Sequence, residues 1–258
     1  MLKLSFSPLK KIIPSIFTMF NLLSGCMAIL ISFSDPALAG LLILLAGIFD
    51  FADGFAARLL DAYSEFGKEL DSLADIISFG AAPSFILFHL INTSLVMSAP
   101  HHGYESLSVP HTLILASAFL PVVFAAIRLA KYNISTGESD DFSGLPSPAA
   151  GIFIASAGYV LVTSELTLVR EFFFNPATLV SAGIIVSVLM VIPIRMFSIK
   201  FRHFRLAGNR VRYLFLLPSL VLFIWWGIAA IPLITGWYVF LSAIIAITCR
   251  KQADPGHT

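Results

Sequence analysis

Apolar stretches of membrane-spanning length dominate this sequence and limit it to a helical membrane fold. Of its 258 residues, 58% are hydrophobic and 12% are charged, whereas an ordinary soluble domain carries about 25% charged residues. A transmembrane helix needs about 20 consecutive, mainly apolar residues. The sequence predicts eight helices, at about residues 15–33, 37–60, 69–91, 111–131, 147–164, 176–194, 213–231 and 236–249. We therefore expect an all-α, polytopic transmembrane bundle that forms a single domain over residues 1–258.

The basic residues indicate how this bundle is oriented. With eight spans and a cytoplasmic N-terminus, 15 of the 16 lysines and arginines fall on the cytoplasmic side, and Arg170 falls outside. This distribution follows the positive-inside bias, so both termini are expected in the cytoplasm. The last two helices can also be read as one broken helix, which would give seven spans. Residues 1–13 mix Leu and Phe with lysines, which is typical of either an interfacial helix on anionic lipid or a disordered basic tail.

Acidic residues are concentrated near the cytoplasmic ends of the second and third helices. Seven of the 15 lie between Asp50 and Asp75. Asp50 and Asp53 are three residues apart, and Asp71 and Asp75 are four apart, so each pair shares one helix face. Four carboxylates within spans would cost roughly 10 kcal/mol on insertion scales unless they had partners. Because Mg²⁺ and Mn²⁺ bind carboxylates together with substrate phosphates, we interpret the four aspartates as a metal site.

The residues beside these acids have the size and charge that a phosphate ligand needs. Gly54 and Ala57 lie on or next to the face of Asp53, where a large side chain would keep a diphosphate from the metals. Arg58 can offer a planar fork of N–H groups to phosphate oxygens, although an arginine here could also be a membrane anchor. Gly67 lies one turn before Asp71 and could equally serve as a loop or helix-packing glycine.

Together these residues form the pattern DxxDGxxAR(x8)GxxxDxxxD, which runs from Asp50 to Asp75. The pattern resembles the signature of the CDP-alcohol phosphotransferase family in all eight positions and in their spacing. The resemblance implies a helical membrane enzyme whose active site opens to the cytoplasm. It also implies transfer of a phosphatidyl group from CDP-diacylglycerol to an alcohol, with CMP as the leaving group. Two divalent cations, Mg²⁺ or Mn²⁺, would be held by the four aspartates, and Asp75 would act as the general base.

Two further stretches resemble the phosphatidylserine synthase branch of this family. They are RLAKYN, from Arg128 to Asn133, and FSGLPSPAA, from Phe142 to Ala150. The resemblance predicts L-serine as the acceptor, and a zwitterionic amino acid needs a cation for its carboxylate. Arg128 and Lys131 are the predicted acceptor-binding residues, with membrane anchoring as their alternative role.

The resemblance also implies a set of contacts with the CDP-lipid. At the first helix, family members often carry Pro-Asn-x-x-Thr, whereas here Pro14 is followed by Ser15, with Thr18 and Asn21 retained. The predicted CDP-lipid-binding residues are Gly54, Ala57, Arg58, Ser64, Gly67, Thr18 and Asn21.

Other functions fit parts of the same sequence. The acceptor could be glycerol 3-phosphate, inositol or choline, and the donor could be an archaeal ether lipid. A polytopic, ion-coupled transporter could also use intramembrane acids, but these acids cluster towards one side of the membrane. The expected partners are the two substrates and membrane lipid, without nucleic acid. The expected location is a prokaryotic inner or cell membrane, with a homodimer as one option for the assembly.

Overall fold

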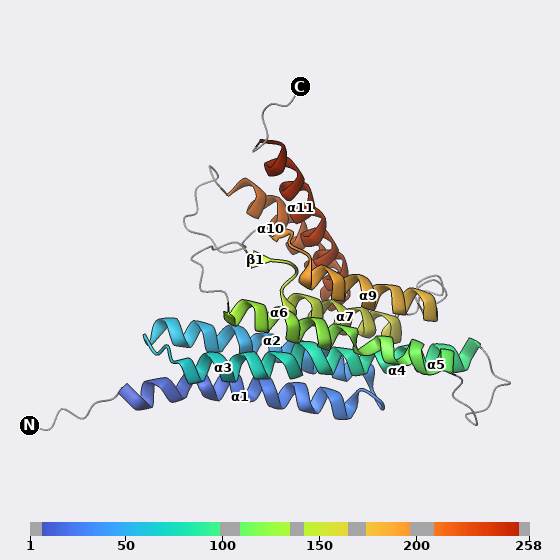
Figure 1. The fold of residues 1–258 in the computed structure, drawn as a ribbon, viewed down its shortest axis with the longest axis horizontal. Helices are drawn as coiled ribbons and strands as arrows, with labels where there is room; N and C mark the ends of the chain where they lie inside the picture. Colours follow the sequence, from blue (N-terminus) through green and yellow to red (C-terminus); the bar gives the residue numbers. More distant parts are fainter. Residues whose placement is uncertain (1–6, 99–108, 135–141, 165–173, 197–208, 253–258) are drawn as a thin grey trace, which may run out of the picture.

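The computed structural model describes residues 7–98, 109–134, 142–164, 174–196 and 209–252, which form a bundle of helices (Figure 1). The helices and strands are α1 (Ser7–Ile31), α2 (Pro36–Leu59), α3 (Glu65–Asp75), the π-helix η1 (Ile76–Ala81), α4 (Ala82–Ser98), α5 (Val109–Ala116), the 3-10 helix η2 (Ser117–Phe119), α6 (Leu120–Ile134), β1 (Phe142–Ser143), α7 (Ser147–Thr163), α9 (Pro176–Val191), β2 (Arg195–Met196), α10 (Arg210–Trp226), the 3-10 helix η3 (Gly227–Ala230) and α11 (Ile231–Gln252).

Each predicted helix has a counterpart in the structure, and five helical stretches are long and apolar enough to cross a membrane. These are Ile12–Ile31, Pro36–Leu59, Glu65–Met97, Val109–Ile134 and Arg210–Ile245. The helices α7 and α9 are apolar but shorter. The stretch from α10 through η3 to α11 corresponds to the last two predicted helices. A helical membrane bundle is therefore confirmed, while the count of eight spans and the cytoplasmic termini stay predictions.

Two single segments add detail to the expected fold. The helix α1 begins at Ser7 and continues into the first span, so an interfacial position for residues 1–13 stays a prediction. Within the helical bundle, β1 and β2 pair antiparallel over two residues each, with Phe142 opposite Met196. Gly144 follows β1 with φ of +80°, a conformation that ends the strand and is accessible to glycine without strain.

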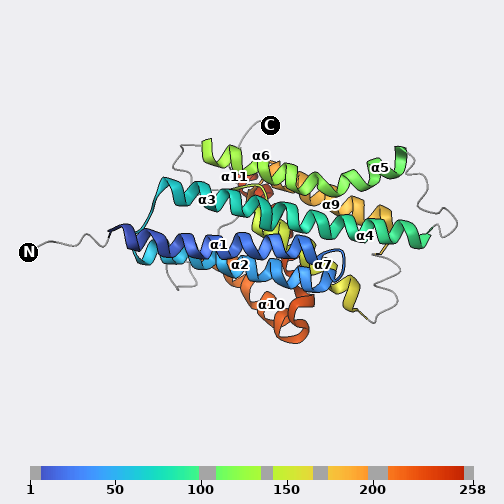
Figure 2. The same cartoon turned by 90° about the horizontal axis from the view of Figure 1, so that it is seen from below.

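The helices α1 and α2 and the continuous stretch from α3 through η1 to α4 run side by side along the long axis of the molecule, and α11 runs obliquely to them (Figures 1 and 2). Within this arrangement α1 packs along α2, α2 packs on α7, and α6 packs on α9. The starts of α1 and α3 and the ends of α2 and α6 lie together at one end of the bundle (Figure 1). We call this the site end.

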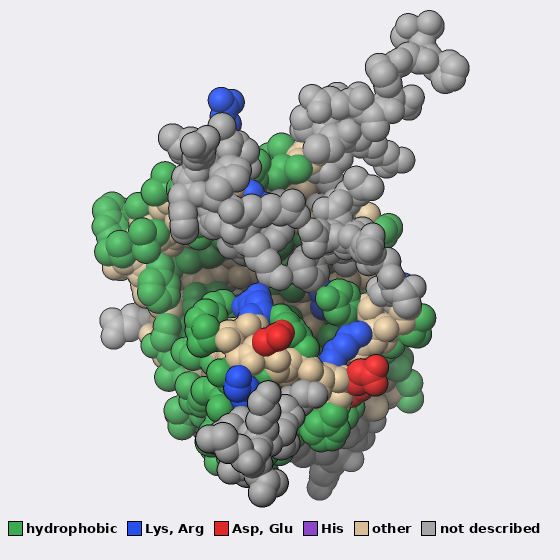
Figure 3. Space-filling view, turned by 90° about the vertical axis from the view of Figure 1, so that its left-hand side faces the viewer, with side chains coloured by type: hydrophobic (Ala, Val, Ile, Leu, Met, Phe, Trp, Pro, Cys, Tyr) green, Lys and Arg blue, Asp and Glu red, His purple; other side chains and the backbone are tan. Residues whose placement is uncertain are grey.

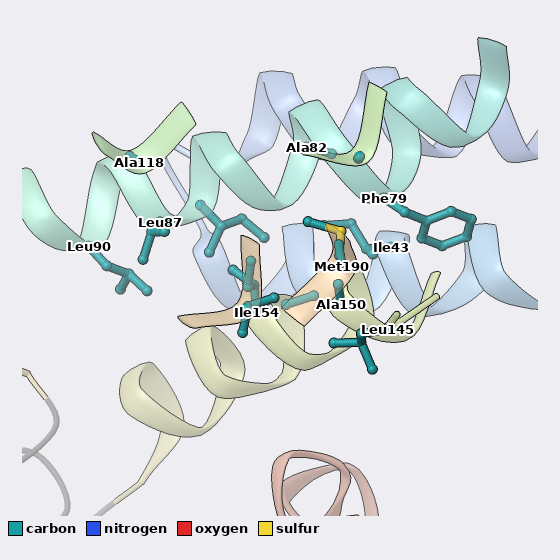
Figure 4. Packing of buried hydrophobic residues seen from close by; sticks show 14 of the residues in the cluster. Ile43, Phe79, Ala82, Leu87, Leu90, Ala118, Leu145, Ala150, Ile154 and Met190 are labelled. Atoms are coloured by element: carbon teal, nitrogen blue, oxygen red, sulfur yellow. The ribbon is translucent and has the colours of Figure 1, made fainter. Parts of the chain in front are cut away.

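The core lies between α2, η1, α4, α7 and α9 and is built from aliphatic and small side chains around Phe79. Ile43, Phe79, Ala150, Ile154 and Met190 are all buried within one cluster (Figure 4). Large apolar side chains also cover the outside, as with Leu30 at 71% exposure and Trp225 at 78%. An apolar exterior of this kind suits contact with lipid rather than water.

The π-helix η1 follows Asp75 directly and is held between two glycines from other helices. A Cβ atom on Gly25 of α1 would lie 2.7 Å from Cα of Ser78, and a Cβ atom on Gly151 of α7 would lie 2.7 Å from Cα of Phe79. Only glycine permits these backbones to approach so closely. Short π-helical turns inside longer helices are often found at functional sites. The two contacts therefore fix η1, the segment directly after Asp75, against α1 and α7.

Replacing Gly151 with alanine should destabilise the fold, because the new methyl group would overlap backbone atoms of Phe79 that cannot rotate away. Overpacking of this kind costs about 1–3 kcal/mol. Gly236→Ala is the matched control, since its Cβ would meet nothing within 4 Å. Samples heated in detergent and then analysed by size-exclusion chromatography should show a lower Tm for Gly151→Ala and an unchanged Tm for the control. Equal Tm values for the two variants would contradict the close contact.

Candidate active site

Charged side chains gather at the site end of the bundle. Seen from this end, lysine, arginine and acidic side chains stand among apolar ones (Figure 3). Arg58 lies in the last turn of α2, and Lys131 lies in the last turn of α6. Basic and acidic residues that are far apart in the sequence therefore lie at the same end of the bundle. The position of this end in the cytoplasm stays a prediction.

The chain reverses between α2 and α3 and so brings the two aspartate pairs together. Asp61 adopts φ of 48° in the short connection, a left-handed conformation that aspartate tolerates better than most residues. Ser64 then begins α3 as its N-cap, where its Oγ accepts a hydrogen bond of 3.0 Å from the backbone N–H of Gly67. The paired faces of α2 and α3 consequently meet.

Three of the four aspartates form a compact group. Carboxylate oxygens of Asp50, Asp53 and Asp71 all lie within 4.8 Å of one another. Asp53 is 6% exposed, and Oδ1 of Asp71 is buried without a hydrogen-bond partner among the described residues. A buried carboxylate oxygen without a donor is costly, and three oxygen ligands suit a hard divalent cation. The residues present therefore fit a metal ion.

Asp75 has a different environment from the other three aspartates. It is 7% exposed and does not belong to the three-carboxylate group. It nevertheless lies close enough to Asp50 and Asp71 for their charges to interact. The predicted set of four metal ligands thus resolves into a group of three and a separate, buried neighbour. A role for Asp75 that differs from simple metal ligation fits this geometry.

Two side chains of helix α1 donate hydrogen bonds to these carboxylates. Oγ1 of Thr18 donates a 2.8 Å hydrogen bond to Oδ2 of Asp53, and Nδ2 of Asn21 donates a 3.3 Å bond to Oδ1 of Asp75. Both side chains are buried, Asn21 completely. Ser78, in the π-helix, donates to the backbone carbonyl of Asn21 at 3.0 Å and ties α1 to η1. Thr18 and Asn21 therefore orient aspartates, whereas their contact with a CDP-lipid stays a prediction.

A cavity of about 230 Å³ opens beside the aspartates. Asp71 and Asp75 form part of its wall, so Asp71 belongs both to the three-carboxylate group and to the cavity. Its other walls come from α3, α6 and the start of α7. The polar or charged residues that line it, besides the two aspartates, are Lys68, Ser72, Arg128, Tyr132, Asn133 and Ser147.

Arg128 enters this cavity with part of its guanidinium free. Its Nη1 donates to Oγ of Ser147 at 3.2 Å, while its Nε is buried without a hydrogen-bond partner in the described structure. Its guanidinium lies near enough to Asp75 for their charges to interact, and the Tyr238 side chain is close by. Tyr238 is 7% exposed and packs its ring against Phe215 with centroids 5.6 Å apart. Helix α11 thus reaches the site although no motif in the C-terminal helices indicated a role for them.

The remaining predicted residues occupy distinct positions around the aspartates. A Cβ atom on Gly54 would meet nothing within 4 Å, so space is open there. Arg58 is exposed and Ala57 partly buried on α2. Gly67 and Ser64 have the capping role already described, and their CDP contacts stay predictions. Lys131 is exposed and does not line the cavity.

Sequence reasoning missed six polar or charged residues at the cavity or beside it, namely Lys68, Ser72, Tyr132, Asn133, Ser147 and Tyr238. Asn133 and Ser147 lie within the two stretches RLAKYN and FSGLPSPAA, but no charge or spacing distinguishes them there. Ser72 lies between two aspartates and resembles an ordinary helix residue. Tyr238 has no local signal at all. Only tertiary packing gives these residues a place in the site, since α6 and α7 pack on η1 and α11 packs on α7.

More than half of this chain matches a known protein family. Residues 11–189 match the sequence profile of the CDP-alcohol phosphatidyltransferase family. The chain belongs to this family. The matched part contains every described residue of the three-carboxylate group and of the cavity. Membership of a membrane-bound enzyme family agrees with the long apolar helices.

Several curated proteins are similar to this chain. One is the CDP-diacylglycerol–serine O-phosphatidyltransferase of Helicobacter pylori, 38% identical over 144 residues, which are 55% of this chain and 54% of the relative. Another is the enzyme of the same name from Bacillus subtilis, 31% identical over 194 residues, or 75% of this chain and 91% of the relative. A third is the archaetidylserine synthase of Methanothermobacter thermautotrophicus, 33% identical over 159 residues, or 60% and 61%. The chain therefore spans about half the length of the Helicobacter relative.

Thr18→Val should weaken metal binding without unfolding the protein, because it keeps the shape of the side chain and removes the donor to Asp53. Loss of a hydrogen bond that orients a metal ligand costs roughly 10- to 100-fold in affinity. Thr163→Val, which removes a hydroxyl from the exposed end of α7, is the matched control. Titration with Mn²⁺ followed by electron paramagnetic resonance should give a Kd raised at least about tenfold for Thr18→Val. An unchanged Kd would mean that Thr18 does not orient Asp53.

Proposed function

We propose that this protein transfers the phosphatidyl group of CDP-diacylglycerol to L-serine and produces phosphatidylserine and CMP. One observation carries the proposal: Asp71 is shared between the three-carboxylate group and the cavity. A donor diphosphate at the carboxylate group and a small acceptor in the cavity would therefore meet at adjoining positions. Such proximity is what a transfer between two bound substrates requires.

The donor would bind along α2 and the start of α3. Asp50, Asp53 and Asp71 would hold divalent cations, Mg²⁺ or Mn²⁺, with Asp75 beside them. These cations, when bound, would neutralise the diphosphate and stabilise charge on the attacking and leaving oxygens. The open space at Gly54 supports close approach of the diphosphate, and the exposed guanidinium of Arg58 is available to phosphate oxygens.

The acceptor would bind in the cavity between α3, α6 and α7. A volume of about 230 Å³ is below the roughly 300–1,000 Å³ of sites for drug-sized ligands, so a molecule with few atoms fits best. Arg128 would pair with the serine carboxylate through its free Nε–H. With this arrangement the acceptor role falls on Arg128, and that of Lys131 has no comparable support.

Asp75 is proposed as the group that takes the proton of the serine hydroxyl. It lines the cavity and is oriented by Asn21. As the hydroxyl oxygen forms its bond to the phosphorus of the phosphatidyl group, the bond from that phosphorus to the CMP oxygen breaks. The proton of that hydroxyl passes to the Asp75 carboxylate. Because Asp75 lines the cavity, this base would lie within reach of the attacking oxygen.

An ether-lipid donor is the second candidate. It is favoured by the Methanothermobacter relative, whose name specifies archaetidylserine. Serine is common to the names of all three relatives, which supports it over glycerol 3-phosphate, inositol or choline as the acceptor. We further propose that the site end faces the cytoplasm, because α2, α3 and α6 each present basic residues there.

Release of CMP by the purified protein in detergent tests the proposed reaction. With Mg²⁺ or Mn²⁺ and CDP-diacylglycerol, L-serine should give CMP and phosphatidylserine, whereas the other acceptors should give neither. EDTA should stop the reaction, and Asp53→Asn should reduce it by at least about a thousandfold, since a ligand to the site is lost. An archaeal CDP-ether lipid, supplied in parallel, identifies the donor. Product formation with another acceptor alone would refute serine.

Gly54→Ala separates a substrate-binding role from a structural one. Because the added methyl group would meet no protein atom, the Tm should stay the same or rise slightly. If the diphosphate occupies that space, the KM for CDP-diacylglycerol should rise roughly tenfold or more, while the KM for serine should change little. Gly236→Ala again serves as the control. A wild-type KM for the donor would place the diphosphate elsewhere.

A further inference from the structure

Three buried polar atoms around the cavity have no hydrogen-bond partner within the described residues. They are Nε of Arg128, Oδ1 of Asp71 and Oδ1 of Asn133, and all three residues line the cavity. Leaving a buried donor or acceptor unsatisfied costs about 1–3 kcal/mol, so such atoms are rare without a functional reason. Their grouping around one cavity indicates a ligand that offers both an acceptor and a donor.

The orientation of the Asn133 amide follows from its neighbours. Its Nδ2 donates a 3.1 Å hydrogen bond to Oγ of Ser72, and that hydroxyl donates its own proton to the backbone carbonyl of Lys68 at 3.1 Å. A hydroxyl has a single proton, so Ser72 must accept from Asn133 and cannot donate to it. The amide oxygen is therefore the end of Asn133 that is left for a ligand.

Three other hydrogen-bond acceptors of the cavity already have a proposed role or an observed partner. Asp71 belongs to the proposed metal group, Asp75 is the proposed proton acceptor, and Oγ of Ser147 accepts from Arg128. The partner of Asn133 must be a hydrogen-bond donor, because an amide oxygen can only accept. A protonated amine gives the strongest such bond, and the neighbouring carboxylates favour a positive charge.

We propose that Asn133 is a specificity-determining residue that binds the ammonium group of the acceptor, while Arg128 binds its carboxylate. This inference rests on the proposed function and deepens it, since it states which part of the acceptor each residue recognises. The substrate class that fits is a small zwitterionic amino acid with a hydroxyl group. Inositol and glycerol 3-phosphate lack the ammonium, and the quaternary nitrogen of choline has no N–H to donate.

Serine analogues that lack one group each provide the test. The acceptor 3-hydroxypropionate is serine without its ammonium, and ethanolamine is serine without its carboxylate. The full-length wild type should use L-serine with a kcat/KM at least about tenfold above that for 3-hydroxypropionate, because a hydrogen bond to a charged group is worth about 1.5–3 kcal/mol. Ethanolamine should also be a poor acceptor, but through loss of the contact with Arg128.

Asn133→Leu keeps the approximate volume and removes the amide. It should lower kcat/KM for serine by about 10- to 100-fold and leave that for 3-hydroxypropionate within about threefold, so the preference collapses. The KM for CDP-diacylglycerol should not change. Asn92→Leu, on α4, is the matched control, because Asn92 is partly buried but does not line the cavity.

Asn133→Asp covers the case in which Asn133→Leu fails to fold. It retains the shape and offers the ammonium a full negative charge, so the preference for serine over 3-hydroxypropionate should be kept or increased. If Asn133 had a purely structural role, either variant would lower kcat/KM equally for both acceptors, and that result would overturn the inference. Equal use of the two acceptors by the wild type would also overturn it while leaving the transfer reaction intact. Absence of any CMP release by the wild type would instead refute the proposed function.

Discussion

Mutual repulsion among four aspartates at the junction of α2 and α3 is the constraint on which the rest of this structure depends. The hydrogen bonds that Asp53 and Asp75 receive come from Thr18 and Asn21, which are neutral and do not cancel charge. Arg128 interacts with Asp75, but one guanidinium cannot balance four carboxylates. Neutral donors and Arg128 alone therefore leave the four carboxylates short of positive charge. Divalent cations bound here would supply that charge and would couple the stability of the site to its chemistry.

Close packing of the helices fixes the orientation of these carboxylates. The contact of Gly25 with Ser78 and the bond from Ser78 to the carbonyl of Asn21 fix α1 against η1. Asn21 and Asp75 then stand at a defined separation, because each is anchored within one turn of that contact. On the opposite face, Gly151 brings α7 against Phe79. The same helix brings Ser147 to Arg128, so one packing arrangement positions both the aspartates and Arg128.

Local patterns in the sequence were enough to predict the helices and the pairing of the aspartates on helix faces. Spacings of three and four residues act within one helix, so the pairing of Asp50 with Asp53 needs no tertiary information. The bond from Thr18 to Asp53 joins helices, and no spacing encodes it. Asn133 and Tyr238 were missed for the same reason. The strands β1 and β2 escaped prediction because two residues carry no alternation pattern.

The π-helical turn between α3 and α4 has a consequence for the phase of the long helix. Each residue of an α-helix advances the side-chain direction by about 100°, whereas the wide turn at Ile76–Ala81 takes up an additional residue within nearly the same rise. The aspartate face before the turn and the core-facing side of α4 after it are therefore out of phase. A regular α-helix through Ile76–Ala81 would rotate one of these faces relative to the other. The wide turn thus lets one continuous helix present its carboxylates in one direction and its core residues in another.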